Sequence, residues 1–489
     1  MKRLRSVVVK VVTTTGGHMK LGKSAALALL AILTFHAAQV SPPFGGVFAL
    51  FICLLIRASS QAGARCSFYL GLVVGFGIYA PQLGFFYTLF GPAAVLLWSI
   101  LALYTGLFAF AAERLSGRGR LGLLLLPFVW TGLEYFRSEL NYLRFTWLSA
   151  GYTVDPTLAG LLGVYGTGFV MAGLGVAASA ARPRYAGIVL LIAACSGPLT
   201  SSLPQRERNG TTLMVSGVQA EFPEPETIPR LLDSAWKQSP GADLFVLSEY
   251  SLQTPPTEAI LDWCKLRRRH LVIGGREPLP GNTFQNTAYV INPAGQIVHK
   301  QGKSVPIQFF ADGVPADSRT VWESPWGPIG ICICYDLSYT SVTDDLIRQG
   351  AHALIVPMMD LQDWGERQHR LHARIGPARA AEYGVPMVRL ASSGISQIIT
   401  ADGKVIESGS FPGQAEVVSG EIKLKGAGQI PWDRPLAHVA TAIAAATLIY
   451  CFLGSTKLPR IGPSSPRESV EALAHQRSFA GKNSAIRSS

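Results

Sequence analysis

The chain has 489 residues, of which 48% are hydrophobic and only 15% are charged. A soluble globular protein carries about 25% charged residues, so this composition excludes a purely soluble chain and predicts that much of it lies in a membrane. The net charge of +12 arises outside residues 204–434, which hold 22 basic and 25 acidic residues. Because this basic excess lies in short loops and tails beside apolar segments, it favours a role in membrane topology over nucleic-acid binding.

Seven apolar segments precede residues 204–434 and an eighth follows them. The segments are 24–39, 44–57, 67–86, 91–112, 121–136, 158–180, 186–203 and 436–454. About 20 apolar residues cross the ~30 Å of bilayer hydrocarbon, so each segment is predicted to be a membrane span. The first two are short and are joined by Ser41-Pro-Pro43, which leaves either two spans with little tilt or a re-entrant pair.

Basic residues precede the first span and follow the second, fourth, sixth and eighth. Since these are alternate loops, all of them can lie in the cytoplasm. A cleavable signal peptide is not expected, because further spans follow the first one. The sequence therefore predicts five parts, namely a cytoplasmic N-terminus at 1–23, a seven-span membrane domain at 24–203, a domain outside the cytoplasm at 204–434, a membrane helix at 435–455 and a disordered basic cytoplasmic tail at 456–489.

Residues 204–434 alternate short apolar runs with helical patterns, which is typical of a layered α/β domain. The predicted strands are 212–218, 243–247, 271–273, 288–291, 329–334, 353–356 and 387–390. The predicted helices are 227–238, 257–269, 340–348 and 368–383.

Two cysteines stand near the end of the predicted strand at 329–334. Cys332 and Cys334 lie on the same face of that strand, so alternation alone does not separate them, and core packing is the alternative for both. The turn into the helix at 340–348 favours Cys334, because helical amide groups there should favour the thiolate that attacks carbonyl carbon. The seven cysteines show neither a disulfide framework nor the spacing of zinc ligands, and no metal or cofactor is expected.

Two more polar residues follow apolar strands. Glu249 stands at the mouth of the strand at 243–247, where scarce water should raise the pKa of its carboxyl and suit a general base. The alternative is an ordinary turn carboxylate. Lys303 offers a positive charge for an oxyanion, with Lys300 as a rival and a solvated surface lysine as the alternative.

Glu249, Lys303 and Cys334, in this order and each at a strand end, resemble the Glu-Lys-Cys triad of the carbon–nitrogen hydrolase (nitrilase-like) superfamily. The apolar segments on both sides of the domain make the chain similar to the membrane branch of that superfamily, the apolipoprotein N-acyltransferases. Further motifs that resemble this family in order and spacing are Glu134-Tyr-Phe-Arg137, Phe145-Thr-Trp-Leu-Ser-Ala-Gly-Tyr152, Asn286, Cys334-Tyr-Asp336, Gln368-His369, Arg379-Ala-Ala-Glu382, Gly384-Val-Pro386 and 389–396.

The chain departs from the family pattern near the lysine and after the cysteine. The family's Pro-Phe-Gly-Glu becomes Pro306-Ile-Gln-Phe309, which lacks the supporting glutamate, and Asp312 is the candidate to replace it. The lysine lies closer to this proline than in the family, so Lys300 stays an alternative to Lys303. Asp336 stands where the family has a glutamate.

The resemblance implies an αββα sandwich on the periplasmic side of the bacterial inner membrane. It implies that Cys334 takes an acyl chain from a phospholipid of the bilayer as a thioester and passes it to the N-terminal amine of a diacylglyceryl-cysteine apolipoprotein. Glu249 would act as base, while Lys303 and an amide near Tyr335 would hold the oxyanion. The residues expected to bind substrate are Asn286, Tyr335, Phe309 and Trp364. An apolar mouth is expected from Phe309, Phe310, Met358, Met359 and Trp364, with ordinary packing as the alternative.

Other functions would use the same residues. A membrane-anchored amidase or nitrilase acting on a small amide would need the triad, but a soluble substrate needs no membrane spans. An inactive lipid-binding scaffold would tolerate the absent glutamate, but it would have no need of an intact triad. A transporter is less favoured, because few charged residues lie within the spans.

Overall fold

The computed structural model describes residues 22–200 and 210–454. The residues up to Thr447 belong to one compact unit, and of the second unit only the end of the last helix is described. The predicted N-terminus, apart from residues 22 and 23, and the predicted tail at 456–489 lie outside the described residues.

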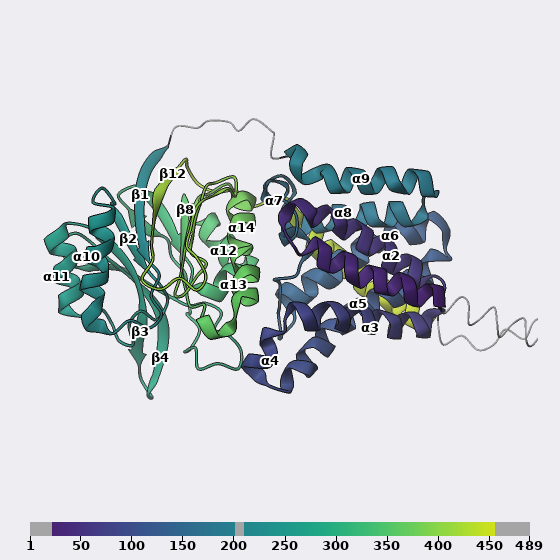
Figure 1. Cartoon of the computed structure of the whole chain (residues 1–489), viewed down its shortest axis with the longest axis horizontal. Coiled ribbons are helices and arrows are strands. Elements are labelled where there is room, and N and C mark those ends of the chain that lie inside the picture. Colours follow the sequence, from purple (N-terminus) through teal and green to yellow (C-terminus); the bar gives the residue numbers. More distant parts are fainter. Residues whose placement is uncertain (1–21, 201–209, 455–489) are drawn as a thin grey trace, which may run out of the picture. The chain divides into compact units, whose positions relative to one another are not determined.

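Residues 22–200 form helices joined by short connections, and one further helix ends the described chain (Figure 1). Each apolar segment predicted from the sequence overlaps at least one helix, although the segments at 67–86 and 158–180 are each divided between two α-helices. The helices are Gly22–Ala38, η1 (Pro42–Val47), α2 (Phe48–Ser59), α3 (Ala64–Gln82), α4 (Phe85–Phe90), α5 (Ala93–Ser116), α6 (Gly119–Tyr135), η2 (Phe136–Leu140), η3 (Ala150–Tyr152), α7 (Pro156–Leu162), α8 (Val164–Ala180), α9 (Pro183–Thr200) and α15 (Asp433–Leu453).

Within the described residues, three helices are long and apolar enough to cross a membrane, namely Pro42–Ser59, Ala93–Ser116 and Asp433–Leu453. The helices α7 and α8 would add a fourth span if they act together, although they are bent by 101° at their junction. These helices support a membrane domain, and their count is lower than the eight spans predicted from hydropathy.

Small residues allow α3 and α5 to pack closely. Gly71 and Gly75, one helical turn apart on α3, face Ala109 and Ala102 of α5. A Cβ atom on Gly71 would lie 2.6 Å from the Cβ of Ala109, and one on Gly75 would lie 2.7 Å from the Cα of Ala102. Helices in a membrane associate through such close backbone contact, because lipid tails are as apolar as the side chains.

Two six-stranded sheets form the centre of the region that follows. The first has the order β12-β1-β2-β3-β4-β5 and the second the order β11-β10-β9-β8-β7-β6, with parallel strands at the centre of each. The strands are β1 (Thr211–Val218), β2 (Leu244–Leu247), β3 (His270–Leu279), β4 (Thr283–Ile291), β5 (Ile297–Gly302), β6 (Trp322–Ser324), β7 (Gly327–Ile331), β8 (Ala353–Met358), β9 (Met387–Ala391), β10 (Gln397–Ile399), β11 (Val405–Ser408) and β12 (Val417–Leu424).

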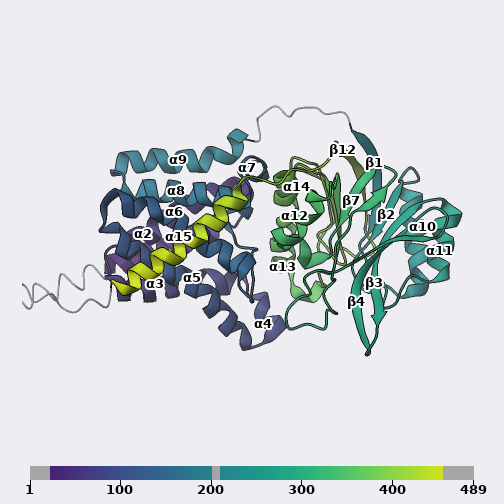
Figure 2. The same ribbon diagram turned by 180° about the vertical axis from the view of Figure 1, so that it is seen from behind.

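Helices cover the outer face of each sheet (Figures 1 and 2). The first sheet carries α10 (Ile228–Gln238) and α11 (Glu258–Arg267), and the second carries α12 (Thr340–Arg348), α13 (Glu366–Ala373) and α14 (Ile375–Tyr383). The short helices η4 (Pro225–Thr227), η5 (Cys334–Ser338) and η6 (Gln362–Trp364) lie in the connections. The predicted αββα sandwich is therefore confirmed for this domain.

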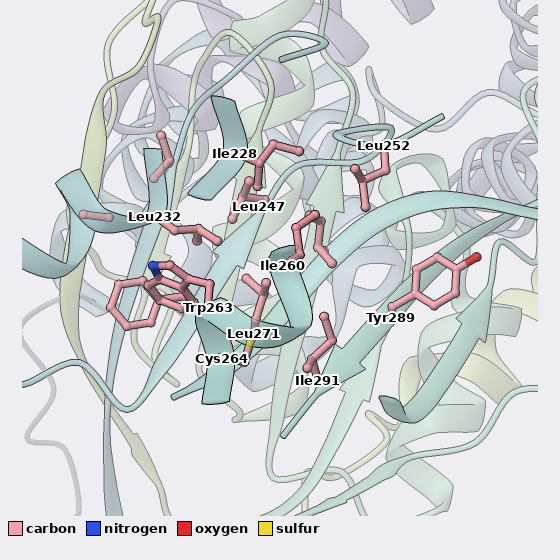
Figure 3. Close-up of a cluster of buried hydrophobic side chains, with 14 of the residues drawn as sticks. Ile228, Leu232, Leu247, Leu252, Ile260, Trp263, Cys264, Leu271, Tyr289 and Ile291 are labelled. Atoms are coloured by element: carbon pink, nitrogen blue, oxygen red, sulfur yellow. The ribbon is translucent and has the colours of Figure 1, made fainter. Parts of the chain in front are cut away.

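Apolar side chains hold the first helical layer on its sheet (Figure 3). Leu232 of α10 and Trp263 of α11 pack with Leu247, Leu271 and Ile291 of the strands. Fully burying one such side chain contributes roughly 1.5–3 kcal/mol, so this cluster is a main stabilising element of the domain.

Two predicted elements differ from the observed ones. The strand expected at 329–334 ends at Ile331, so Cys334 lies beyond it. The single helix expected at 368–383 is broken at Arg374 into α13 and α14. Pro377 accounts for the break, because its ring nitrogen has no hydrogen to donate to the carbonyl of Ala373.

Buried ion pairs join the first turn of α15 to the helices of the second sheet. The Arg434 guanidinium lies 2.9 Å from Asp344 of α12 and 2.8 Å from Glu382 of α14. Beside it, the Asp433 carboxylate accepts the backbone N–H of Tyr165, at the start of α8, at 2.8 Å. Largely buried charged groups thus connect the sandwich to the apolar helices.

Candidate active site

Cys334 lies at a sharp turn after β7. Its φ angle is +52°, in the left-handed region that a residue with a Cβ seldom adopts. The Asp336 carboxylate holds this turn, because it accepts the backbone N–H of Ile333 at 3.1 Å. It also accepts the N–H groups of Ser304 and Val305, at 3.1 and 2.7 Å. Asp336 therefore joins the cysteine turn to the segment that follows Lys303.

Glu249 lies two residues after β2 and is 1% exposed. Its Oε1 accepts hydrogen bonds from Lys303 Nζ at 2.8 Å and from Asn286 Nδ2 at 2.6 Å. Its Oε2 accepts the backbone N–H of Met359 at 2.7 Å. The carbonyl of Met359 in turn accepts the thiol of Cys334, with 3.8 Å between sulfur and oxygen. A single residue after β8 thus holds both the carboxylate and the thiol.

A second carboxylate, Asp312, completes the group around Lys303. Its Oδ2 lies 2.7 Å from Lys303 Nζ, and its Oδ1 accepts the Tyr250 hydroxyl at 2.7 Å and Asn286 Nδ2 at 3.0 Å. Asp312 therefore occupies a place beside the lysine despite its different spacing in the sequence.

The two carboxyls differ in their acidity. Burial raises the pKa of Glu249, and the Asp312 charge adds to this effect against the opposing effect of Lys303. Lys303 holds the pKa of Asp312 below its usual range although burial opposes it. Burial would lower the pKa of Lys303, but the charge of Glu249 and its neighbours raises it well above the usual value. Asp312 and Lys303 thus remain charged, and Glu249 is the carboxylate that takes up a proton more readily.

The thiol of Cys334 is neutral at rest. Burial raises its pKa well above the usual value, and the Glu249 charge adds to this, while Lys303 opposes it. The expectation that helical amides stabilise a thiolate here is wrong for the resting site. The residues after Cys334 form the short turn η5, and α12 begins only at Thr340.

Lys300 and Cys332, the alternatives to Lys303 and Cys334, lie outside this group of side chains. Lys300 is half exposed on β5, and its Nζ pairs with Glu277 at 2.9 Å. Cys332 is buried just beyond the end of β7, and burial raises the pKa of its thiol well above the usual value. The structure brings Lys303 and Cys334 to Glu249 and places Lys300 on the surface.

An apolar pocket contains Cys334 in its wall. Its cavity volume is about 110 Å³. The helices α4 and α5 contribute Phe85, Phe86, Leu89, Phe90, Leu97, Ile100 and Leu101. The remaining wall consists of residues 143–145, Trp147, residues 307–310, Cys334, Tyr335, Trp364, Gln368 and His372. The pocket therefore joins Cys334 of the sandwich to side chains of the apolar helices.

Three of the four residues expected to bind substrate lie in this wall, namely Phe309, Tyr335 and Trp364. The fourth, Asn286, is fully buried behind Glu249, and it contacts the two carboxylates instead of the pocket. Phe310 also lines the pocket. Of the two methionines expected at the mouth, Met358 is buried in β8 and Met359 takes part through its backbone.

The pocket residues of α4 and α5 were not predicted from the sequence. The aromatic side chains Phe85, Phe86 and Phe90 come from a segment that was assigned to the third span and the connection after it. The cluster of aromatic residues directly before Gly91-Pro92 is the feature of the sequence that could have indicated them. Phe145 and Trp147 were noted only as part of a motif, and they also line the pocket.

Comparison with known families gives two matches. Residues 24–177 match the Apolipoprotein N-acyltransferase N-terminal domain. Residues 225–431 match the Carbon-nitrogen hydrolase family.

Among curated proteins, an apolipoprotein N-acyltransferase of Geobacter metallireducens is 25% identical, over 86% of this chain and 94% of its own length. One of Shewanella oneidensis is 24% identical, over 79% of this chain and 88% of its own length. A formamidase of Helicobacter acinonychis is 28% identical, but over only 26% of this chain and 43% of its own length.

Among solved structures, Nit3 of Saccharomyces cerevisiae, a member of branch 10 of the nitrilase superfamily, matches with a TM-score of 0.40. It is 19% identical and covers 45% of this chain and 93% of its own.

Proposed function

The chain belongs to the apolipoprotein N-acyltransferase family, and from this premise we propose that Cys334 carries an acyl chain from a membrane phospholipid to the N-terminal amine of an apolipoprotein. The observation that carries the proposal is the pocket shared by the Cys334 thiol and the aromatic and aliphatic side chains of α4 and α5. A nucleophile at the wall of such a pocket suits a reactive carbonyl at the end of a long hydrocarbon chain.

In the first half of the reaction, Glu249 accepts the proton of Cys334 while the sulfur attacks the ester carbonyl carbon of the phospholipid. The Lys303 ammonium and a backbone N–H near Tyr335 stabilise the oxyanion that forms. The ester C–O bond then breaks, and the leaving oxygen takes the proton from Glu249. A lysophospholipid departs, and the acyl chain remains on Cys334 as a thioester.

In the second half, the α-amino nitrogen of the diacylglyceryl cysteine attacks the thioester carbonyl carbon. The C–N bond forms and the C–S bond breaks, and one N–H proton passes through Glu249 to the departing thiolate of Cys334. The product is an apolipoprotein with an amide-linked third chain. A thioester suits this step, because it keeps the acyl group reactive toward an amine.

The apolar helices have an energetic role in this proposal. Moving a chain of ~16 carbons from lipid into water would cost on the order of 10 kcal/mol at ~0.8 kcal/mol per methylene group. A pocket lined by Phe86, Phe90 and Leu97 next to Cys334 lets the chain stay among apolar groups while its ester reacts.

We extend the proposal to eight spans and to a catalytic domain on the periplasmic face of the inner membrane. Helices at all eight predicted positions and basic residues in alternate loops support it. An epitope inserted at the exposed tip between β3 and β4, next to Gly281, should react with antibody added to spheroplasts. An epitope at Gly117, between α5 and α6, should react only after lysis, and the reverse pattern would invert the topology.

Intact-protein mass spectrometry after incubation with phospholipid tests the chemistry. The unsubstituted protein should gain the mass of one acyl chain and lose it when a diacylated lipopeptide is added. Cys334→Ala should gain nothing, whereas Cys332→Ala should still gain the chain. An adduct that persists in Cys334→Ala would place the nucleophile elsewhere.

The amidase alternative finds less support in the pocket, because a small amide would leave the apolar walls from α4 and α5 unfilled. Ammonia release from short aliphatic amides, measured beside acyl transfer, separates the two functions. An inactive scaffold would instead leave Cys334 unreactive toward a mild alkylating reagent in the presence and absence of lipid.

A further inference from the structure

A second polar group lies in the wall of the Cys334 pocket, and the reaction described above does not use it. Helix α13 contributes Gln368 and His372, one turn apart and each 1% exposed. The Asp360 carboxylate binds both, since its Oδ1 accepts Gln368 Nε2 at 2.9 Å and lies 2.7 Å from His372 Nδ1. Arg389 lies 2.6 Å from the other carboxylate oxygen.

The charges of this group determine where the protons lie. Although burial opposes them, the hydrogen bond from His372 and the charge of Arg389 hold the pKa of Asp360 far below its usual range. An ionised carboxylate only accepts hydrogen bonds, so His372 donates from Nδ1. Burial lowers the pKa of His372 against the opposing effect of Asp360, so the ring is neutral and its Nε2 carries a lone pair.

Two acceptor atoms of this group have no hydrogen-bond partner among the residues that the structure describes. They are His372 Nε2 and Gln368 Oε1. Leaving a buried acceptor without a donor is unfavourable, and the surrounding pocket is mostly apolar. The ring of Trp147 stacks on that of His372, with 4.6 Å between centroids and 17° between planes, and so holds the imidazole in place. The two acceptors therefore fit a ligand group that brings two donors.

We propose that Gln368 and His372 form a subsite for a primary amine beside the Cys334 thioester, an inference that rests on the acyl transfer proposed above. A neutral primary amine has two N–H donors and one lone pair. If both acceptors take an N–H, the lone pair stays free to attack the thioester carbonyl carbon. If the protein offered a hydrogen-bond donor instead of these acceptors, that donor would bind the nitrogen lone pair and block its attack on the thioester.

The backbone places this subsite next to the nucleophile. Asp360 directly follows Met359, whose carbonyl accepts the Cys334 thiol. The Trp147 ring that stacks on His372 also contacts Tyr335, with 6.4 Å between centroids. Two substrates carry such an amine, namely the apolipoprotein at its N-terminus and a donor lipid with an ethanolamine headgroup. Measuring acyl-enzyme formation and discharge separately distinguishes them, because the lipid takes part in the first step and the apolipoprotein in the second.

The experiment measures each half-reaction with the full chain in lipid nanodiscs. Acyl-enzyme formation is followed with phosphatidylethanolamine and with phosphatidylglycerol, which has no amine, and discharge of the acyl-enzyme is followed with a diacylated lipopeptide. The variants are His372→Phe, which keeps a flat ring against Trp147, and Gln368→Met. His372→Gln, which restores an acceptor, should recover part of the loss. Arg370→Gln, on an exposed side chain of α13, is the control.

Each removed acceptor should slow the step that uses the amine about tenfold, and the double variant about a hundredfold, while acylation by phosphatidylglycerol stays unchanged. A loss in discharge assigns the amine to the apolipoprotein, and a loss confined to phosphatidylethanolamine assigns it to the headgroup. Both outcomes support the subsite. An equal loss with phosphatidylglycerol, or no loss in any step, would overturn it.

A binding measurement keeps the subsite separate from the proposed function. Dodecylamine should protect Cys334 from alkylation more strongly than dodecanol, and His372→Phe should abolish the difference. If the protein formed no acyl adduct, the proposed function would fail, while a preference for the amine would still support the subsite. Equal protection by the two compounds would refute the subsite even in an active enzyme.

Discussion

At the scale of single residues, the site pairs a neutral thiol with a buried carboxylate whose raised pKa suits it to take up the thiol proton. The Cys334 thiol and the Glu249 carboxylate share Met359, and both groups have raised pKa values because they are buried. The Lys303 ammonium pairs with both Glu249 and Asp312. Because its positive charge is shared between two carboxylates, it lowers the pKa of Glu249 less than it would in a pair with Glu249 alone. The second carboxylate thus preserves the basicity of the first.

This arrangement predicts a pH dependence for thioester formation. Glu249 must be ionised to accept the thiol proton, so the rate should fall as the pH drops through its raised pKa. Asp312→Asn removes a negative charge that raises this pKa, and the acidic limb of the pH–rate profile should move to lower pH. The profile is measured as acyl-enzyme formation, with Lys300→Gln as a control. A shift to higher pH would contradict this view of the two carboxylates.

Replacing the proposed base, Glu249, should lower the reaction rate more than the Asp312 substitution does. Glu249→Gln keeps the shape of the side chain but cannot accept a proton, so acyl-enzyme formation should slow about 10²–10⁴-fold. Discharge of a preformed thioester should slow as well, because the same carboxylate handles the amine proton. A variant that slowed only one half-reaction would mean that the other step uses a different base.

The two lysines should differ sharply. Lys303→Met removes the buried cation beside the oxyanion and should lower the rate by at least about 10²-fold. Lys300→Met breaks only a half-exposed pair with Glu277 and should leave the rate within about twofold. The comparison needs only acyl-enzyme formation under identical conditions, and equal losses would remove Lys303 from the proposed mechanism.

At the scale of elements, the cysteine turn depends on one carboxylate that connects two strands. Asp336 accepts backbone N–H groups from its own turn and from the segment after β5, which carries Lys303. Cys334 and Lys303 follow strands of different sheets, so the distance between them depends on this connection.

Asp336→Ala should therefore lower the free energy of unfolding by about 2–4 kcal/mol, because three backbone N–H groups, of which those of Ile333 and Val305 are buried, lose their acceptor. Thermal unfolding in detergent measures the change. Asp345→Ala, which removes a partly exposed pair with Arg319, should cost less than about 1 kcal/mol and serves as the control. Similar losses in both variants would mean that the Asp336 contacts contribute little.

The same scale includes the close packing of α3 on α5. Gly71→Leu should separate the two helices and lower thermal stability and yield, because its Cβ would approach the Ala109 Cβ to 2.6 Å. Gly187→Leu, on α9 with no atom within 4 Å of the added Cβ, should be tolerated. Equal stability of the two variants would show that the α3–α5 contact can relax without cost.

At the scale of the whole molecule, the described unit is held together by buried charges between its apolar helices and its sandwich. Arg434 pairs with Asp344 and Glu382, which belong to helices of the second sheet. The pocket also needs both parts, since its walls come from α4, α5 and the sandwich. Loss of the junction should therefore reduce stability and acyl transfer together.

Arg434→Met should destabilise the protein by about 3–5 kcal/mol, because the buried Asp344 carboxylate loses its close cation and Glu382 keeps only Arg379. Arg348 offers a matched control, since it approaches the same Asp344 at 3.8 Å from an exposed position. Arg348→Met should cost less than about 1 kcal/mol. Calorimetry in detergent compares the two, and an equal effect would contradict a structural role for the buried pair.

The sequence by itself determined the elements whose signal is local. Apolar segments and short β-branched runs report burial directly, so all the predicted apolar helices and all seven predicted strands are present. The strands β6, β10 and β11 were missed because they are short, and β5 and β12 because polar and charged residues interrupt their apolar positions. The order of Glu249, Lys303 and Cys334 was enough to select three side chains, of which Lys303 and Glu249 lie 2.8 Å apart.

Only the tertiary structure decided the features that depend on neighbours distant in the chain. Asp312 lies beside Lys303, Asn286 turns toward the carboxylates, and burial keeps the Cys334 thiol neutral. The pocket brings α4 and α5 to a cysteine more than two hundred residues away. Hydropathy and spacing describe a residue and its near neighbours, whereas pKa values and pocket walls arise from groups that meet only after the chain has folded.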